Sequence, residues 1–169
     1  SITDISLGDS VRRDMCVMFL HLGVDAPLSG TLDRLNMLEF FNETLQRINP
    51  VISRHGGFVD KYLAEGCMVL FPDDSNAALG CAQELARLMR QYNTERALSL
   101  LPSVKFSAGI HRGTLILGTI GERERMESTV ISDVVNTASR MMEWALASEK
   151  CIVISEDIAS RLDGANLSW

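Results

Sequence analysis

Several features are missing from this 169-residue chain, and each absence narrows the range of functions. No stretch approaches 18 consecutive apolar residues, so a membrane-spanning helix is not expected. No block of Lys and Arg occurs and the net charge is −6, which argues against a nucleic-acid surface and against contact with anionic lipid. No internal repeat, low-complexity segment or N-terminal signal peptide is visible. We therefore expect a soluble domain.

Closely spaced pairs of cysteines are also missing. The four cysteines at positions 16, 67, 81 and 151 form no CxxC motif, and each lies in an apolar run. This pattern argues against a zinc site or a disulfide framework, and it predicts buried free thiols in a reducing compartment.

The length and composition predict one domain with a substantial core. The polar, mixed residues 1–14 are expected to form a linker or lead-in, and residues 15–169 the domain. Because the chain opens at Ser1 and closes at Trp169 without a tail, we expect a piece of a longer protein.

Short apolar runs alternate with helical spacing along the chain. They predict strands over 15–22, 58–63, 67–71, 104–110, 115–120, 128–131 and 151–154. Helices are expected to begin near Thr31, Asp74, Asp133 and Ser155. Pro50 is expected to kink or end the first helix, and Arg112-Gly113 to turn the chain between two strands. Hairpins beside long helices predict an α+β fold, a mostly antiparallel sheet with helices packed on one face.

The stretch 121–143 combines a short β-like run with the start of a helix. Asn136 and Arg140 are four residues apart, so both project from one helical face. An amide and a guanidinium side by side can bind an oxygen anion, because Arg offers a fixed fork of donors. The alternative from spacing alone is a solvated polar face.

Three blocks, in order along the chain, carry a family resemblance: RHGGFVDKYLAEG (54–66), KFSAGIHRGTLILGTIG (105–121) and STVISDVVNTASRMME (128–143). With the segments around them, over about residues 15–162, they resemble the catalytic domain of class III adenylate and guanylate cyclases. The resemblance implies a ferredoxin-like α+β core that works as a head-to-tail dimer, either with itself or with another cyclase domain.

Each active site of that family is shared between two chains and converts a nucleoside triphosphate to its 3′,5′-cyclic monophosphate and pyrophosphate. One chain binds two divalent metals, Mg²⁺ or Mn²⁺, through two Asp residues. The other chain recognises the purine and supplies a transition-state Asn and Arg. The resemblance therefore implies ATP or a related nucleotide as the ligand.

The resemblance assigns roles to particular residues. Asn136 and Arg140 match the transition-state pair. Lys61 and Thr129 match the purine-binding pair in its adenine-type form, which favours ATP over GTP.

The metal side departs from the family pattern. His21 and Glu65 occupy the two metal-binding Asp positions, with the backbone of Leu22 beside them. The loop that wraps the triphosphate reads LGVDA over 22–26, so its Gly is displaced and Asp25 stands at its Phe position.

These departures leave three readings open. Mg²⁺ and Mn²⁺ favour oxygen ligands, and the longer Glu65 side chain shifts its carboxylate by about 1.5 Å. The chain is therefore expected to be degenerate, inactive as a homodimer and without metals of its own, acting as a regulatory or dimerising module. It could otherwise form the non-metal half of a cyclase heterodimer. The third reading is an active adenylate cyclase, a phosphorus–oxygen lyase dependent on Mn²⁺.

Alternatives also remain for single residues. His21 is a strand-end histidine bonded to backbone or a ligand for a softer ion such as Zn²⁺, and Glu65 is solvated or a ligand. By analogy with the family, the domain is expected in the cytoplasm, as part of a larger multidomain or membrane-anchored signalling protein, without touching the membrane itself.

Overall fold

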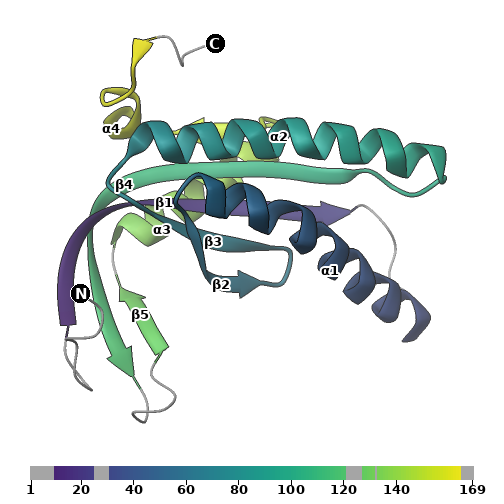
Figure 1. Ribbon diagram of the computed structural model, residues 1–169, viewed down its shortest axis with the longest axis horizontal. Helices are drawn as coiled ribbons and strands as arrows, with labels where there is room; N and C mark the ends of the chain where they lie inside the picture. Colours follow the sequence, from purple (N-terminus) through teal and green to yellow (C-terminus); the bar gives the residue numbers. More distant parts are fainter. Residues whose placement is uncertain (1–9, 25–30, 121–126, 132, 165–169) are drawn as a thin grey trace.

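The computed structural model describes residues 10–24, 31–120, 127–131 and 133–164. The strands are β1 (Ser10–Val24), β2 (Phe58–Leu63), β3 (Gly66–Pro72), β4 (Val104–Ile120), β5 (Glu127–Ile131) and β6 (Ile152–Ile154). The helices are α1 (Thr31–Arg54), α2 (Ser75–Leu98), α3 (Asp133–Ala147) and α4 (Glu156–Ala159). The predicted α+β class is confirmed, since β2-β3-β1-β4-β5 form an antiparallel ladder (Figure 1). Among the described strands, only β6 pairs in parallel, with β4.

The strand β1 lies at the centre of the sheet, and its side chains enter one apolar core on each face. Its side chains alternate between faces, so Met18 and Leu20 join the core under α1 and α2, while Val17 and Phe19 join a second core with Ala138 of α3. A strand covered on both faces needs a continuous apolar run, and residues 15–20 of β1 are all buried. The helices therefore cover both faces of the sheet, with α3 behind it in Figure 1, and the prediction of helices on one face was wrong.

Two boundaries also differ from the sequence prediction. The strand β1 begins at Ser10, so residues 10–14, expected in the lead-in, belong to the sheet and pair with β4. The helix α1 continues through Pro50 to Arg54. The buried side chains of Val51 and Ile52 extend the apolar face past the proline, and their packing offsets the backbone hydrogen bond that proline cannot make.

The predicted turn at Arg112-Gly113 is absent, because β4 runs unbroken from Val104 to Ile120. Gly113 instead allows close packing. A Cβ placed there would lie 2.6 Å from Cγ2 of Val134 on α3. At Gly109 a Cβ would lie 2.4 Å from the Met142 backbone nitrogen. The two glycines let α3 approach β4 more closely than side chains would permit.

Gly109→Ala is expected to lower the free energy of unfolding by about 3 kcal/mol, because the added methyl group meets α3 backbone that cannot move aside alone. Urea denaturation measures the change. Gly80→Ala on α2 is the matched control, since its Cβ would make only an ordinary 3.5 Å contact with His55. That control is expected to leave stability equal or higher by up to about 1 kcal/mol, since Ala favours helix over Gly. Equal losses in both variants would contradict the packing role.

Three of the four cysteines are buried free thiols as predicted, but Cys151 is exposed, because it precedes β6 instead of lying inside it. Burial raises the pKa of Cys67 and of Cys81 to about 12, so both thiols are protonated at neutral pH. Among the described residues, no helix combines the length and the apolar character needed to cross a membrane.

Candidate functional site

The two predicted metal positions converge at one end of the sheet. His21 lies near the end of β1, where it pairs with Gly66 of β3 and Ser107 of β4. Glu65 lies in the tight turn between β2 and β3. Nδ1 of His21 is 3.9 Å from Oε2 of Glu65, and the exposed fractions of the two side chains are 12% and 58%. The family resemblance assigned both residues to one metal site, and in the structure their side chains lie side by side.

Backbone packing holds the turn against β1. The N–H of Leu22 donates to the carbonyl of Glu65 at 2.7 Å. A Cβ at Gly66 would lie 1.8 Å from the carbonyl oxygen of Leu20, so only glycine fits there. A Cβ at Gly23 would lie 2.7 Å from Nε2 of His21 and 3.3 Å from Oε2 of Glu65. The two glycines therefore make room for the turn and for the His21–Glu65 contact.

This donor set does not fit a pair of Mg²⁺ or Mn²⁺ ions. His21 and Glu65 offer one imidazole and one carboxylate, so at most one negative charge would face two dications. Within the described part of the chain, no group of three or more His, Cys, Asp or Glu side chains is arranged to hold a metal ion. Asp25, noted from the sequence as a further charge near this loop, lies outside the described residues.

Lys61 lies on the edge strand β2, on the face of the sheet that carries α3. It pairs with Met68, whose side chain packs in the α3-side core, and paired residues of an antiparallel sheet point to the same face. The Lys61 side chain is 47% exposed, and its Nζ lies 3.8 Å from Oδ2 of Asp60.

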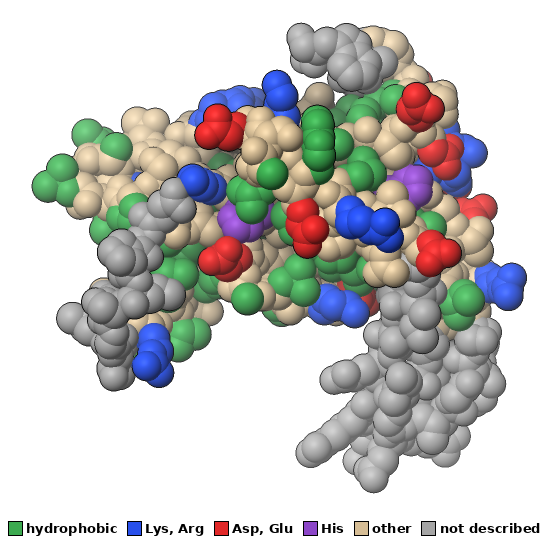
Figure 2. Space-filling model, turned by 180° about the vertical axis from the view of Figure 1, so that it is seen from behind, with side chains coloured by type: hydrophobic (Ala, Val, Ile, Leu, Met, Phe, Trp, Pro, Cys, Tyr) green, Lys and Arg blue, Asp and Glu red, His purple; other side chains and the backbone are tan. Residues whose placement is uncertain are grey.

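Asn136 and Arg140 both lie on α3, where their four-residue spacing predicts one shared helical face, and both are exposed. One turn further, Trp144 is 58% exposed and continues the same stripe, while Ala138 and Ala145 face the sheet. The view from behind shows this side of the molecule, where basic, acidic and histidine side chains are interspersed among hydrophobic ones without a large patch of one charge (Figure 2).

Register along β4 separates Asn136 from the metal positions. His21 lies opposite Ser107, whereas Val134, which immediately precedes the helical turn of Asn136, packs against Gly113. The six-residue step from Ser107 to Gly113 is about 20 Å along an extended strand. The first turn of α3, which carries Asn136, therefore lies further along β4 than the position opposite His21.

Thr129 lies on β5, opposite Gly118 of β4, and Gly118 in turn pairs with Ser10. Ser10 and His21 are at opposite ends of β1, so Thr129 is remote from the His21–Glu65 pair. Figure 1 shows β5 and the adjoining end of β4 bending away from α1 and α2 as an arm. Ser132, which directly precedes α3 and has a side-chain oxygen that could cap it, lies outside the described residues.

The sequence analysis did not single out Asp60, whose side chain is only 5% exposed although it lies on an edge strand.

The other two histidines, His55 and His111, have structural partners. His55 contacts Glu84 of α2 at 2.6 Å, and His111 contacts the hydroxyl of Ser155 at 2.8 Å.

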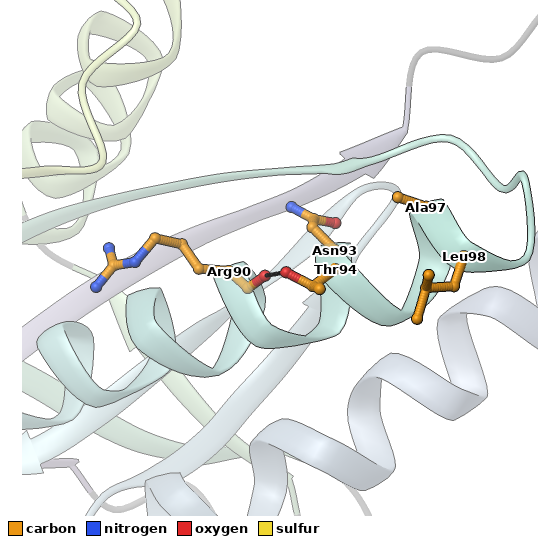
Figure 3. Close-up of a pocket in the computed structure, with 5 residues that line it drawn as sticks. All are labelled: Arg90, Asn93, Thr94, Ala97 and Leu98. Carbon is orange, nitrogen blue, oxygen red and sulfur yellow. Dashed lines mark hydrogen bonds between the residues drawn. The ribbon is translucent and has the colours of Figure 1, made fainter.

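An open hollow on the outer face of α2 is not a second site. Arg90, Asn93, Thr94, Ala97 and Leu98 line it (Figure 3). The Asn93 amide is already used, because it donates to the carbonyl of Val104 at 3.0 Å and accepts from its N–H at 2.7 Å. The Thr94 hydroxyl donates to the carbonyl of Arg90 at 3.2 Å, the dashed contact in Figure 3. These polar groups serve the fold.

Comparison with known proteins gives a consistent result. A family model described as the adenylate and guanylate cyclase catalytic domain matches residues 10–168. An adenylate cyclase from Anabaena cylindrica is 35% identical over 170 residues, covering 95% of this chain and 33% of that protein. The terminal-differentiation-specific adenylate cyclase of Dictyostelium discoideum is 27% identical over 159 residues, covering 90% of this chain and 7% of that protein. The chain thus spans a third or less of these relatives.

Solved structures agree on the fold. The crystal structure of a guanylyl cyclase has a TM-score of 0.76 at 24% identity and covers 92% of this chain and 80% of that one. The guanylate cyclase domain from Catenaria anguillulae, solved with GTP, has a TM-score of 0.73 at 18% identity and covers 91% of this chain and 85% of that one.

Proposed function

The chain belongs to the adenylate and guanylate cyclase catalytic domain family, and from this premise we propose that it is a member with a degenerate metal site. It acts as a regulatory and dimerising domain that can supply the nucleotide-recognising half of a composite active site. The observation that carries the proposal is the His21–Glu65 pair, 3.9 Å apart, in which one imidazole and one carboxylate stand where two dications would need several oxygen ligands.

The retained residues have a defined task in this proposal. Lys61 donates hydrogen bonds to the purine, with Thr129 as its partner, and the pairing favours ATP. Arg140 directs its planar fork of N–H donors at the phosphoryl oxygens, where charge builds up in the transition state. Asn136 orients the ribose from one helical turn away. The exposure of Lys61, Asn136 and Arg140 supports the assignment, since a second chain can reach all three.

Two further features support a dimer as the working form. The offset along β4 between His21 and the first turn of α3, which carries Asn136, supports a site shared between two chains. The 58% exposed Trp144 on the same helical stripe offers apolar area for such a contact. We propose that the dimer operates in the cytoplasm within a longer signalling protein, in keeping with the greater length of the relatives.

A second candidate function is an active adenylate cyclase that uses Mn²⁺. The 35% identity to the Anabaena cylindrica adenylate cyclase over nearly the whole chain favours it. The single carboxylate of the His21–Glu65 pair argues against it, so it takes second place.

Complementation between two inactive forms of the chain tests the proposal. The unmodified chain would be mixed with a triple variant, His21→Asp/Glu65→Asp/Arg140→Ala, which has the metal carboxylates but lacks the phosphate-binding Arg. The mixed dimer contains one complete site, with carboxylates from the variant and Lys61, Asn136 and Arg140 from the unmodified chain. Cyclic AMP formation from ATP with Mg²⁺ is expected in the mixture and in neither protein alone.

The control mixture replaces the unmodified chain by Arg140→Ala alone, so that no dimer holds an Arg at this position. Activity in the first mixture and not in the control supports the half-site role. If both mixtures stay inactive while a mixed dimer is detected by native mass spectrometry, the nucleotide-recognising role assigned to this chain is wrong.

A further inference from the structure

The edge strand β2 contains a one-residue bulge at Asp60. Phe58 pairs with Leu70 and Val59 with Val69, but the next residue of β3, Met68, pairs with Lys61. Asp60 is therefore an extra residue with no partner of its own in the ladder. A bulge of this kind shifts every following side chain to the other face of the sheet.

The bulge decides where Lys61 points. In a regular ladder Asp60 would pair with Met68, and Lys61 would pair with Cys67, whose side chain packs in the core under α1 and α2. With the bulge, Lys61 pairs with Met68 and shares its face, which is the face of α3. The lysine thus reaches the side that carries Asn136 and Arg140 only because Asp60 is inserted before it.

The burial of the Asp60 side chain also lowers the stability of the fold. It is 5% exposed, and its Oδ2 has no hydrogen-bond partner among the residues that the structure describes. Nζ of Lys61 lies 3.8 Å from this oxygen. Burial raises the pKa of the Asp60 carboxyl, so the ionised form costs stability at neutral pH, and that cost falls as the pH drops toward the raised value. Folding alone does not account for a carboxylate at this position.

We propose that Asp60 is a positioning residue for nucleotide recognition: as the bulged residue it turns Lys61 onto the α3 face, and its carboxylate holds the ammonium group oriented for the purine. The proposal rests on the proposed function of Lys61. A buried acceptor that the fold leaves without a hydrogen bond is available to the ammonium group, which reaches it by a small change of its flexible stem.

Asp60→Asn tests the carboxylate with little change of shape. Calorimetric titration of the full chain with ATP and separately with GTP gives the ratio of the two dissociation constants, and a thermal melt gives Tm. In the variant, the preference for ATP over GTP, measured as the ratio of the two dissociation constants, is expected to fall about fivefold. This is the effect expected from the loss of one charge-assisted contact. Its Tm is expected to be unchanged or higher, because a neutral amide replaces a buried carboxylate. Asp163→Asn, the same change at an exposed position near the C-terminal end of the described chain, is the matched control and is expected to alter neither quantity.

Lys61→Ala distinguishes a failure of the inference about Asp60 from a failure of the proposed role of Lys61. If Lys61→Ala abolishes the preference for ATP but Asp60→Asn leaves it intact, Asp60 does not position Lys61 and the inference fails while the role of Lys61 stands. If Asp60→Asn lowers Tm and weakens ATP and GTP binding equally, Asp60 is merely structural and the inference fails as well. If the unmodified chain binds neither nucleotide, or if Lys61→Ala changes neither affinity, the proposed function itself is wrong.

Discussion

The double variant His21→Asp/Glu65→Asp is expected to convert ATP to cyclic AMP and pyrophosphate at least about 100-fold faster than the unmodified chain, because two-metal sites contribute much of the rate in phosphoryl chemistry. The two side chains already converge at 3.9 Å on a turn fixed by the Leu22 to Glu65 hydrogen bond, so the variant changes ligands without moving the backbone. His21→Asp adds a carboxylate, and Glu65→Asp retracts the second one by about 1.5 Å.

The measurement is cyclic AMP formation by the purified variant, first with Mg²⁺ and then with Mn²⁺. Each single variant is expected to gain far less than the pair, because two ions need both carboxylates in place. Glu95→Asp repeats the Glu-to-Asp change on the exposed side of α2 and is expected to gain nothing. A folded double variant without turnover in either metal would show that more than the metal ligands has been lost.

Arg140→Ala in the background of that double variant is expected to lower its kcat by about 10²–10³-fold, with a smaller effect on KM, because the Arg acts on charge that develops in the transition state. Arg140 is exposed on α3, so its truncation is expected to leave the fold unchanged. Arg90→Ala, at an Arg that is also exposed, on the outer face of α2, is the control and is expected to leave kcat unchanged. An unchanged kcat in Arg140→Ala, or equal losses in both variants, would remove Arg140 from the proposed site.

Local features of the fold could be predicted from the sequence where one pattern dominated. The apolar run of β1 and the hairpin around Glu65 were recognised, because a buried strand and a short turn have distinctive compositions. Gly113 misled the prediction, since glycine marks both a turn and a close approach, and only the contact with Val134 distinguishes the two. The continuous apolar run of β1 is consistent with cover on both faces, but it does not show which helix covers the second one. That α3 does so could not be predicted, because it depends on which side chains of β1 the other helices leave uncovered.

The candidate site, too, could be predicted from the sequence only in part. The convergence of His21 and Glu65 followed from the family pattern and is observed at 3.9 Å. The roles of Lys61, Thr129, Asn136 and Arg140 remain predictions. Asp60 escaped notice because a bulge is a property of strand pairing, and the register of β2 against β3 cannot be deduced from the letters of β2 alone.

Cyclic nucleotide production by the unmodified chain is the most direct test of the claim that it lacks a metal site of its own. The purified protein would be assayed with ATP and with GTP at high concentration, in Mg²⁺ and then in Mn²⁺. The proposed function predicts no turnover of either nucleotide by a folded protein. Clear turnover that disappears in Arg140→Ala would contradict it, and would establish that His21 and Glu65 serve an active cyclase.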